Sequence, residues 1–314
     1  MSRRLTATVL LLVLTSLSLM ILVITRRPPS PGVSRPSPTP LPESRAGVMT
    51  PAPPVTAKSL HWATSRDLRT WREQPQAVPG QATPQLARLD GRLVTLSSDT
   101  VRLFIMEQTP TQRDSTAMGP PQALDIEGER DRFQVDPDLV SLPGGVCRLY
   151  YTSTRSGSDP AFDVTEIHSA TRREGRWVRD AGYRFRGVGV VDPDVIHLAD
   201  GRWRLFFTRG PERFIGSAVS VDGLDFEVEP TTRIDGQVSA TIATREGFLM
   251  AYQTYGGRYN QGLLHMARSR DGLHFTSDPD FRWEEKMEQL EGPSVIALPD
   301  GTYLMAYARA QRSF

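Results

Sequence analysis

Three acidic residues in this 314-residue chain stand at the start of similar apolar stretches. The motif Val-Asp-Pro-Asp occurs twice, with Asp136 and Asp192 as its first acids, and Glu-Gly-Pro begins at Glu291. Carboxyl groups that converge on one concave site push each other's pKa values apart, so one stays protonated while another is ionised. Hydrolysis of a glycosidic bond needs that division: one carboxyl group protonates the leaving oxygen, and another activates water or attacks. The same aspartates could instead cap turns at strand starts, or bind calcium through their oxygens.

Each acid precedes a pattern that predicts a β-hairpin. In residues 191–208, two apolar runs flank Ala-Asp-Gly, and Asp-Gly between apolar runs is a strong signal for a tight hairpin turn. Proline directly after the acid fits the first residue of a strand, one of the few places where a sheet accepts proline. The pattern recurs about every fifty residues, which is typical of a β-propeller. Its five copies start at Thr83, Asp136, Asp192, Ser239 and Gly292.

A second hairpin motif indicates how the ring of blades closes. Ser-x-Asp-Gly-x-x-Phe follows two of the copies, at residues 220–226 and 269–275. The sequence His-Trp-Ala-Thr-Ser-Arg-Asp at 61–67 matches His-Met-Ala-Arg-Ser-Arg-Asp at 265–271, although it precedes the first copy. The last copy has no such hairpin after it, so we expect residues 60–72 to complete the last blade. The sequence therefore predicts an all-β, five-bladed β-propeller, closed by its N-terminal hairpin so that no sheet edge between blades is left exposed.

This topology gathers the strand starts at one face. The first strand of each propeller blade lines the axis, so Asp136, Asp192 and Glu291 should ring a central funnel. Side chains two residues further along a strand lie on the same side, which adds two more acids. Second-strand ends and a Gly-containing loop should face the same funnel, where arginines could grip a substrate and tyrosines could stack on a sugar ring. The substrate-binding candidates are Asp138, Asp194, Arg209, Arg309, Tyr255 and Tyr259.

The N-terminus carries a candidate membrane anchor. Residues 5–25 contain no charged side chain and lie between Arg4 and Arg26. At about 1.5 Å per residue, a helix of this length spans the roughly 30 Å of a bilayer's hydrocarbon core. The run is long for a signal peptide and no Ala-x-Ala site follows it, so we favour one transmembrane helix over a cleaved secretory signal. The globular domain would then be extracytoplasmic and tethered to the membrane; after cleavage it would be secreted.

The segment that follows the apolar run predicts a spacer. It holds ten prolines between residues 28 and 54, which favours an extended chain over sheet or helix. We therefore expect an anchor or signal segment at 1–27, a Pro-rich linker at 28–57 and the propeller at 58–314.

Charge and composition exclude some functions. From Val55 onward the chain carries more acidic than basic side chains, which argues against a nucleic-acid partner, since such a partner needs a basic face. Lys58 and Lys286 are the only lysines, a bias toward arginine that we attribute to genome composition. No metal-ligand spacing or phosphate-binding loop is present, so we expect no required cofactor, with structural calcium as the one candidate ion.

The repeated motifs resemble those of a known group of enzymes. Asp-Pro at first-strand starts, Glu-Gly-Pro at another, and Ser-x-Asp-Gly-x-x-Phe hairpins look like the five-bladed propeller glycosidases. These are glycoside hydrolase family 43 and its relatives in families 32, 62 and 68, with the family 130 phosphorylases more distant. The resemblance implies that Asp136 is the base, Asp192 the residue that tunes pKa, and Glu291 the acid. The first blade carries Thr83 where that family has its first acid.

Two functions of different classes follow from these observations. The first is a membrane-tethered glycoside hydrolase that acts on an oligo- or polysaccharide through the funnel carboxylates. The alternative is a noncatalytic propeller that binds a glycan or protein at the cell surface. A phosphorolytic enzyme, with Arg209 and Arg309 gripping phosphate, is a third.

Overall fold

The computed structural model describes residues 55–109, 117–129, 132–142, 145–155, 163–210, 212–256, 261–283 and 288–312. Within these ranges the regular structure is β-strand, and no α-helix is found there. The predicted anchor lies outside them, and the described part of the chain contains no helix that could cross a membrane. Strand β1 (Val55–Ser65) begins inside the segment predicted as linker.

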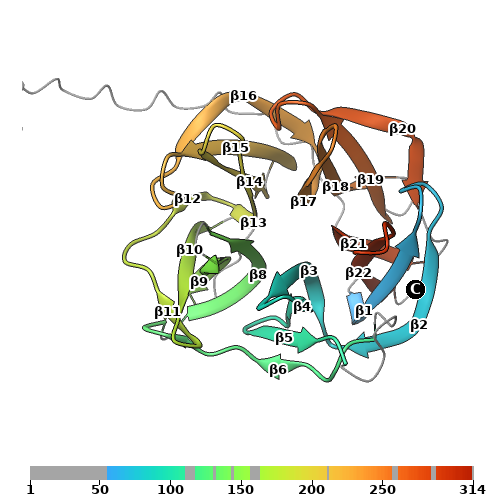
Figure 1. Ribbon diagram of the computed structural model, residues 1–314, viewed down its shortest axis with the longest axis horizontal. Helices are drawn as coiled ribbons and strands as arrows, with labels where there is room; N and C mark the ends of the chain where they lie inside the picture. Colours follow the sequence, from blue (N-terminus) through green and yellow to red (C-terminus); the bar gives the residue numbers. More distant parts are fainter. Residues whose placement is uncertain are drawn as a thin grey trace, which may run out of the picture. The chain divides into compact units, whose positions relative to one another are not determined.

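Five sheets, antiparallel apart from one short parallel pair in blade 2, stand as blades around one axis, as Figure 1 shows. Blades 1 to 5 are numbered along the chain, and each contributes one inner strand beside the axis. The inner strands are β3 (Ala82–Leu89), β8 (Arg132–Ser141), β13 (Val190–His197), β17 (Gln237–Thr244) and β21 (Glu288–Ala297). The second strands are β4 (Arg92–Ser98), β9 (Cys147–Arg155), β14 (Trp203–Arg209), β18 (Gly247–Gly256) and β22 (Tyr303–Arg312).

The outer half of each blade follows the same order. The third strands are β5 (Leu103–Glu107), β10 (Val164–Arg173), β15 (Phe214–Ser220), β19 (Gln261–Ser269) and, in blade 5, β1. The fourth strands are β6 (Gln122–Ala123), β11 (Arg176–Arg179), β16 (Glu227–Asp235), β20 (Thr276–Trp283) and, in blade 5, β2 (Arg72–Pro79). Blade 2 is extended by β7 (Ile126–Glu127), which pairs with β11, and by β12 (Phe185–Val188), which pairs with β10.

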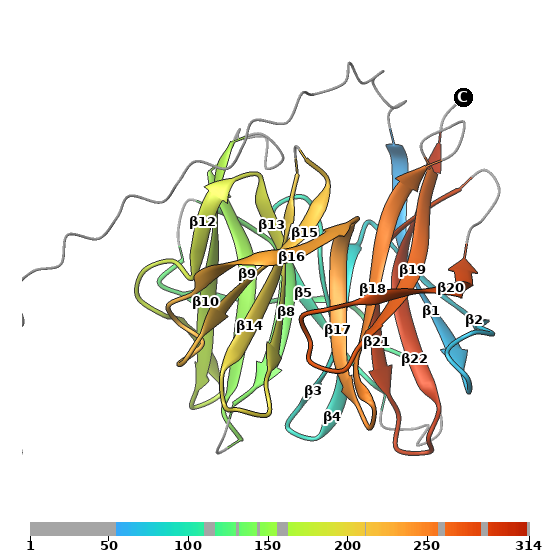
Figure 2. The same cartoon turned by 90° about the horizontal axis from the view of Figure 1, so that it is seen from above.

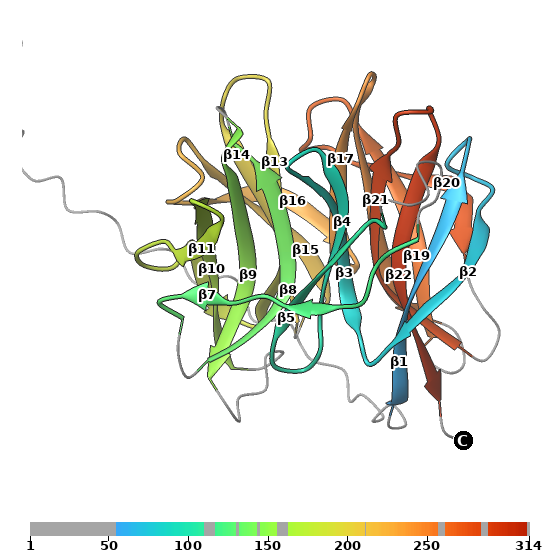
Figure 3. The same ribbon diagram turned by 60° about the horizontal axis from the view of Figure 1, so that its bottom comes forward.

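The N-terminal hairpin closes the ring, which confirms the predicted topology. Strand β1 pairs antiparallel with β22, with His61 opposite Tyr307, and β2 pairs with the outer side of β1. Figure 3 shows β1, in blue, alongside β22, in red, with β2 outside them. The first strand of the domain and its last strand are therefore neighbours in one sheet, and neither leaves an unpaired edge there.

The core is a ring of five apolar clusters, one between each pair of neighbouring blades. Successive side chains of a strand point to opposite faces, so each second strand supplies both of its neighbours. Tyr151 packs in the cluster with Leu96 of blade 1, whereas Tyr150 packs with Leu205 of blade 3, and both tyrosines are fully buried. The blades are thus held by side-chain packing across faces and by hydrogen bonds within sheets.

The ring has two unlike faces, and Figure 2 shows the strands running between them. We call the end at which the inner strands begin, near residues 82, 135, 191, 237 and 291, the entry face. The opposite end, the turn face, carries the hairpin turns after the inner strands and those after the third strands. Asp67, Asp222 and Asp271 lie in the turns after three of the third strands.

Candidate functional site

Every inner strand is interrupted by a β-bulge close to the entry face. In all five blades the register between inner and second strand shifts there, and the first bulged residue has a positive φ. Such a conformation costs a residue other than glycine roughly 1–2 kcal/mol, and strain of this kind gathers at functional sites. The five bulge residues are Thr83, Asp136, Asp192, Val238 and Gly292, with φ from 43° to 56°.

The bulges correct the predicted repeat at one position. In blade 4 the equivalent residue is Val238, not Ser239. In blade 5 the equivalent residue is Gly292. It lies so close to Thr83 that an added Cβ would be 3.3 Å from the Thr83 Cα. Glu291 therefore stands one residue before the bulge, unlike the two aspartates.

The bulges of blades 2 and 3 bring the carboxyl groups of Asp136 and Asp192 into hydrogen-bond contact. Two carboxyl groups share a hydrogen bond only when one of them holds a proton. Removal from water, followed by the charge of Asp136, raises the pKa of Asp192 well above its usual range. Removal from water also raises the pKa of Asp136, although hydrogen bonds from Thr152 and from the Asp192 backbone work against it. The pair therefore keeps a proton that exposed aspartates lose, and Asp192 holds it more strongly.

Two threonines on second strands, Thr152 of β9 and Thr208 of β14, position this pair. Thr152 Oγ1 accepts a hydrogen bond from the backbone N–H of Asp192 at 3.2 Å, and Thr208 Oγ1 accepts one from Val238 N–H at 2.9 Å. Each hydroxyl also hydrogen bonds to the bulge carboxyl group of its own blade. Both threonines are buried. A threonine on one blade's second strand thus fixes the bulge of the next blade and the carboxyl group of its own blade.

Glu291 reaches the same face from blade 5, where it meets Lys58. The Lys58 Nζ lies 2.6 Å from Glu291 Oε2, although the two residues are 233 positions apart in the chain. Burial raises the pKa of Asp136, and the charge of Lys58 offsets part of that effect. After burial and Asp136, the charge of Glu291 also raises the pKa of Asp192. The structure therefore gathers all three predicted acids, with one ammonium group, at one end of the axis.

A cavity of about 20 Å³ lies on the axis between the bulges, lined by residues of all five inner strands. A buried water needs about 10–15 Å³ by this measure, so the cavity admits water and excludes a sugar ring. A saccharide would have to lie above the bulges, with the carboxyl groups as its floor. For the calcium alternative, the described part of the chain shows no cluster of three acidic, His or Cys side chains that could hold a metal ion.

Asp138 and Asp194, predicted to bind substrate, hold inner strands together in this structure. Asp138 accepts hydrogen bonds from Gln85 Nε2 and from the backbone N–H of Val195, both at 2.8 Å. Asp194 accepts from the backbone N–H and the hydroxyl of Thr241, at 3.0 and 2.7 Å. Both carboxyl groups are buried. Their contacts join neighbouring blades along the axis, and substrate binding by them stays a prediction.

The two predicted arginines lie at second-strand ends on the entry face but pair with acids away from the axis. Arg209 Nη2 lies 3.3 Å from Glu212 Oε1, in the loop that follows it. Arg309 Nη2 lies 3.0 Å from Glu73 Oε2, on the outermost strand of blade 5. Each guanidinium group therefore has a carboxylate partner in this state, and substrate binding by either one stays a prediction.

Tyr255 is connected to the site through one side chain. Gln253, which is buried, donates from Nε2 to the Tyr255 hydroxyl at 3.0 Å and accepts from the backbone N–H of Gly292 at 2.6 Å. The guanidinium carbon of Arg213 lies 5.1 Å from the centre of the Tyr255 ring. Tyr259 lies outside the described residues. Of the two predicted tyrosines, Tyr255 is thus connected through Gln253 to Gly292, the residue that follows Glu291.

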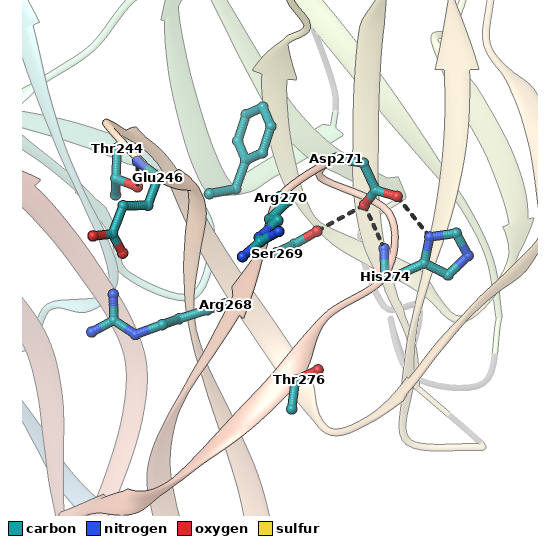
Figure 4. Close-up of a pocket in the computed structure, with 9 residues that line it drawn as sticks. Thr244, Glu246, Arg268, Ser269, Arg270, Asp271, His274 and Thr276 are labelled. Atoms are coloured by element: carbon teal, nitrogen blue, oxygen red, sulfur yellow. Dashed lines mark hydrogen bonds and ion pairs between the residues drawn. The ribbon is translucent and has the colours of Figure 1, made fainter.

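A larger open pocket, of about 870 Å³, lies at the other end of the strands, in blade 4. Figure 4 shows its residues, which come from β17, β18, β19, β20 and the turns between them. Asp271 there accepts hydrogen bonds from the Ser269 hydroxyl and from the backbone and ring of His274. The carboxylate of Asp271 is thus committed to the turn.

Lys58, Thr152 and Thr208 are site residues that were not predicted from the sequence. Thr152 and Thr208 end the copies Tyr-Tyr-Thr and Phe-Phe-Thr, so their recurrence was a usable signal. Lys58 was attributed to composition, but it is one of two lysines in the chain and it contacts the acid of Glu-Gly-Pro. The signal available for Lys58 was its residue type, since the chain otherwise uses arginine almost throughout.

Comparison with known proteins adds information on the fold. No family model matches the chain, and no curated protein matches its sequence. A solved exo-1,5-alpha-L-arabinanase from a bovine ruminal metagenomic library is similar to it at 16% identity and a TM-score of 0.55, over 73% of this chain and 87% of that one. A thermostable family-43 glycoside hydrolase is similar at 11% identity and a TM-score of 0.53, over 75% of this chain and 90% of that one.

A more distant group of glycosidases shares the same architecture. A member of the GH130 family of mannoside phosphorylases, which contains hydrolases that target beta-1,2 mannosidic linkages in Candida mannan, gives 14% identity and a TM-score of 0.52, over 73% of this chain and 84% of that one. At these identities the likeness shows the fold. The resemblance to five-bladed propeller glycosidases drawn from the motifs is confirmed at that level.

Proposed function

We propose that the chain hydrolyses glycosidic bonds with the carboxyl groups of Asp136, Asp192 and Glu291 on the entry face. The observation that supports this most is the division of charge among them. The aspartate pair keeps a proton, whereas Glu291 lies 2.6 Å from the ammonium group of Lys58. A glycosidase needs a protonated and an ionised carboxyl group at one bond. The fold shared with solved glycoside hydrolases agrees with this proposal.

The surroundings of the acids suit such a role. Thr152 and Thr208 hydrogen bond to the bulge carboxyl groups and to the backbone of the next bulge, so little reorganisation is needed when a substrate arrives. The backbone at Asp136 and Asp192 is in a strained, positive-φ conformation that the fold maintains. The narrow axis beneath them admits water alone, so the sugar stays on the open side of the site.

Assay of the full-length protein against a panel of oligosaccharides and aryl glycosides tests the proposal. The panel includes arabinosides, xylosides and mannosides, since the solved structures with this fold act on such linkages by name. We expect hydrolysis of at least one linkage, and a double variant, Asp192→Asn with Glu291→Gln, without turnover. A wild-type protein that binds oligosaccharides in calorimetry but cleaves none would decide for the noncatalytic glycan-binding alternative.

We also propose that residues 5–25 anchor the protein in a membrane, with the propeller on the extracytoplasmic side. The support is the uncharged, bilayer-length run followed by the Pro-rich spacer. The protein should then fractionate with membranes and resist a high-salt wash, because an apolar anchor does not depend on charge. A soluble mature form whose N-terminus begins after residue 25 would show that the segment is a cleaved signal.

A further inference from the structure

Lys58 stands where blade 5 departs from the other four. The residue opposite the position before the bulge is polar in blades 1 to 4 and is Ala308 in blade 5. The four polar residues are Ser98, Thr152, Thr208 and Gln253. In blade 5 the position before the bulge is Glu291 itself, and the polar partner comes from Lys58 on the third strand. A hydrogen-bonding residue has thus been replaced there by an ion pair.

We propose that Lys58 decides which carboxyl group of the site carries the proton: it keeps Glu291 ionised and leaves the proton to be donated on the Asp136–Asp192 pair. This inference rests on the proposed glycosidase function. Lys58 acts as a positioning residue, since it sets the charge of Glu291 and need not touch the substrate. The resulting roles are the reverse of those that the family resemblance implies, where Glu291 is the acid.

The charges around Glu291 support this assignment. A 2.6 Å contact between an ammonium group and a carboxyl oxygen is a short, charge-assisted hydrogen bond, and a cation this close favours the ionised form of Glu291. Asp136 from β8 and Asp192 from β13 bring negative charge to the same site. The other two inner strands contribute Thr83 and Val238, which carry no charge. One ammonium group cannot balance three carboxylates. Lys58 is in direct contact with Glu291, so the proton remains on the Asp136–Asp192 pair, where burial raises the pKa of both groups.

The chemistry follows from this distribution. The proton of the aspartate pair passes to the leaving oxygen as the bond between that oxygen and the anomeric carbon breaks. Glu291 removes a proton from water as the water oxygen bonds to the anomeric carbon. One water is consumed for each bond cleaved, and solvent returns the proton from Glu291 to the pair. Glu291 is thus the base and Asp192 the stronger holder of the donated proton.

Carboxyl NMR of the full-length protein, labelled with ¹³C at Asp Cγ and Glu Cδ, tests the proton distribution without any assay of turnover. Signals are assigned by their loss in Asp192→Asn and Glu291→Gln. We expect Glu291 to be ionised and Asp192 protonated in the wild type at neutral pH. Lys58→Met removes the ammonium group in contact with Glu291, so a larger fraction of Glu291 should be protonated at a given pH than in the wild type, and Lys58→Arg should restore the wild-type behaviour.

Two results would overturn the proposal: a protonated Glu291 in the wild type at neutral pH, or a Glu291 titration that Lys58→Met does not move. If Lys58→Met fails to fold, the wild-type spectra still decide the first point. If the wild type cleaves no glycoside, the proposed function fails while the titrations stand, so the two failures are distinguishable.

Leaving-group dependence supplies an activity test. A general acid matters for poor leaving groups and little for activated aryl glycosides. Asp192→Asn should therefore keep most turnover of an activated aryl glycoside, whereas Glu291→Gln should lose it on every substrate. The opposite pattern would restore Glu291 as the acid and overturn the assignment.

Discussion

Aspartates at the two faces of the ring belong to the same repeats but have opposite environments. On the entry face, Asp136 and Asp192 are half-buried and face each other, and burial raises the pKa of both. On the turn face, hydrogen bonds from the backbone N–H groups of Thr70 and Arg69 lower the pKa of Asp67 to about 2. The environment therefore disfavours the ionised form of the entry-face aspartates and favours the ionised form of the turn-face aspartate Asp67.

The turn-face aspartates repeat with the same hydrogen bonds. Ser220 Oγ donates to Asp222 Oδ1 at 2.9 Å, and Ser269 Oγ donates to Asp271 Oδ1 at the same distance. The backbone N–H groups two and three residues after each aspartate also bond to that oxygen. A set of hydrogen bonds that recurs unchanged from blade to blade indicates a structural role, because each blade needs the same turn.

The entry face differs from blade to blade at equivalent positions. The five bulge residues include two aspartates, and blade 5 displaces its acid by one residue and adds Lys58. These differences between blades lie together at one end of the axis, whereas an arrangement that serves the fold would be the same in every blade. In this propeller, residues that repeat from blade to blade therefore serve the fold, and the positions at which the repeat is broken form the candidate site.

The largest expected effect is a loss of activity when an aspartate of the entry face is substituted, with no such loss for an aspartate of the turn face. Asp192→Asn should slow hydrolysis of substrates with poor leaving groups by about 10²–10⁴-fold, the usual contribution of general acid catalysis. The variant keeps the size of the side chain and its contact with Thr208, so the loss is chemical. Steady-state kinetics on one oligosaccharide provides the measurement.

The matched control is Asp222→Asn on the turn face. This variant should keep kcat and KM within about twofold of the wild-type values, since no step of the reaction uses Asp222. Equal losses in the two variants would mean that both faces affect activity through the fold, and the distinction between them would be lost.

Much of the fold could be predicted because local sequence carries it. Asp-Gly turns between apolar runs specify hairpins, and the match between residues 61–67 and 265–271 identified the strand that closes the ring, as the pairing of β1 with β22 shows. The bulges could not be predicted, because Thr83 and Val238 adopt positive φ only under the constraint of neighbouring strands. This is why Ser239 was placed one residue away from its true equivalent.

The candidate site was predictable in part. Asp136, Asp192 and Glu291 could be placed together because propeller topology converts strand starts into neighbours. The contact of Lys58 with Glu291 joins residues 233 positions apart, through a strand that completes the ring from the other end of the domain. The structural role of Asp138 was hidden for a similar reason, since its partner Val195 belongs to the next blade and is identified only by strand register.

The pH dependence of stability should differ in sign between the two faces. The folded-state pKa of Asp192 lies above the unfolded value of about 3.9. Its stabilising contribution is therefore complete below about pH 4 and is lost as the pH rises toward the folded-state value. Asp67, with a folded-state pKa of about 2, contributes stability above about pH 4 that is lost as the pH falls toward 2.

Urea unfolding from pH 4 to 8 measures this difference. Asp192→Asn removes a group that resists ionisation, so the variant should gain stability over the wild type as the pH rises, by about 1.4 kcal/mol for each unit of pKa displacement. Its free energy of unfolding should therefore change less with pH over this range. A variant that is destabilised equally at pH 4 and pH 8 would contradict the raised pKa of Asp192.

The smallest expected effect concerns the repeated turns themselves. Ser220→Ala removes the hydroxyl that donates to Asp222 and accepts from the backbone N–H of Gly223 at 3.0 Å. The loss should cost about 1 kcal/mol of unfolding free energy, and Ser269→Ala, whose contacts match, should cost the same. The hydrogen-bond partners of the two serines are different, so the double variant should show the sum of the two costs. Thr152→Val and Thr208→Val on the entry face should instead be non-additive, because their bulge carboxyl groups share one proton. If the serine pair couples as strongly as the threonine pair in urea unfolding, the turns are not independent copies, and repetition would no longer separate structural aspartates from candidate catalytic ones.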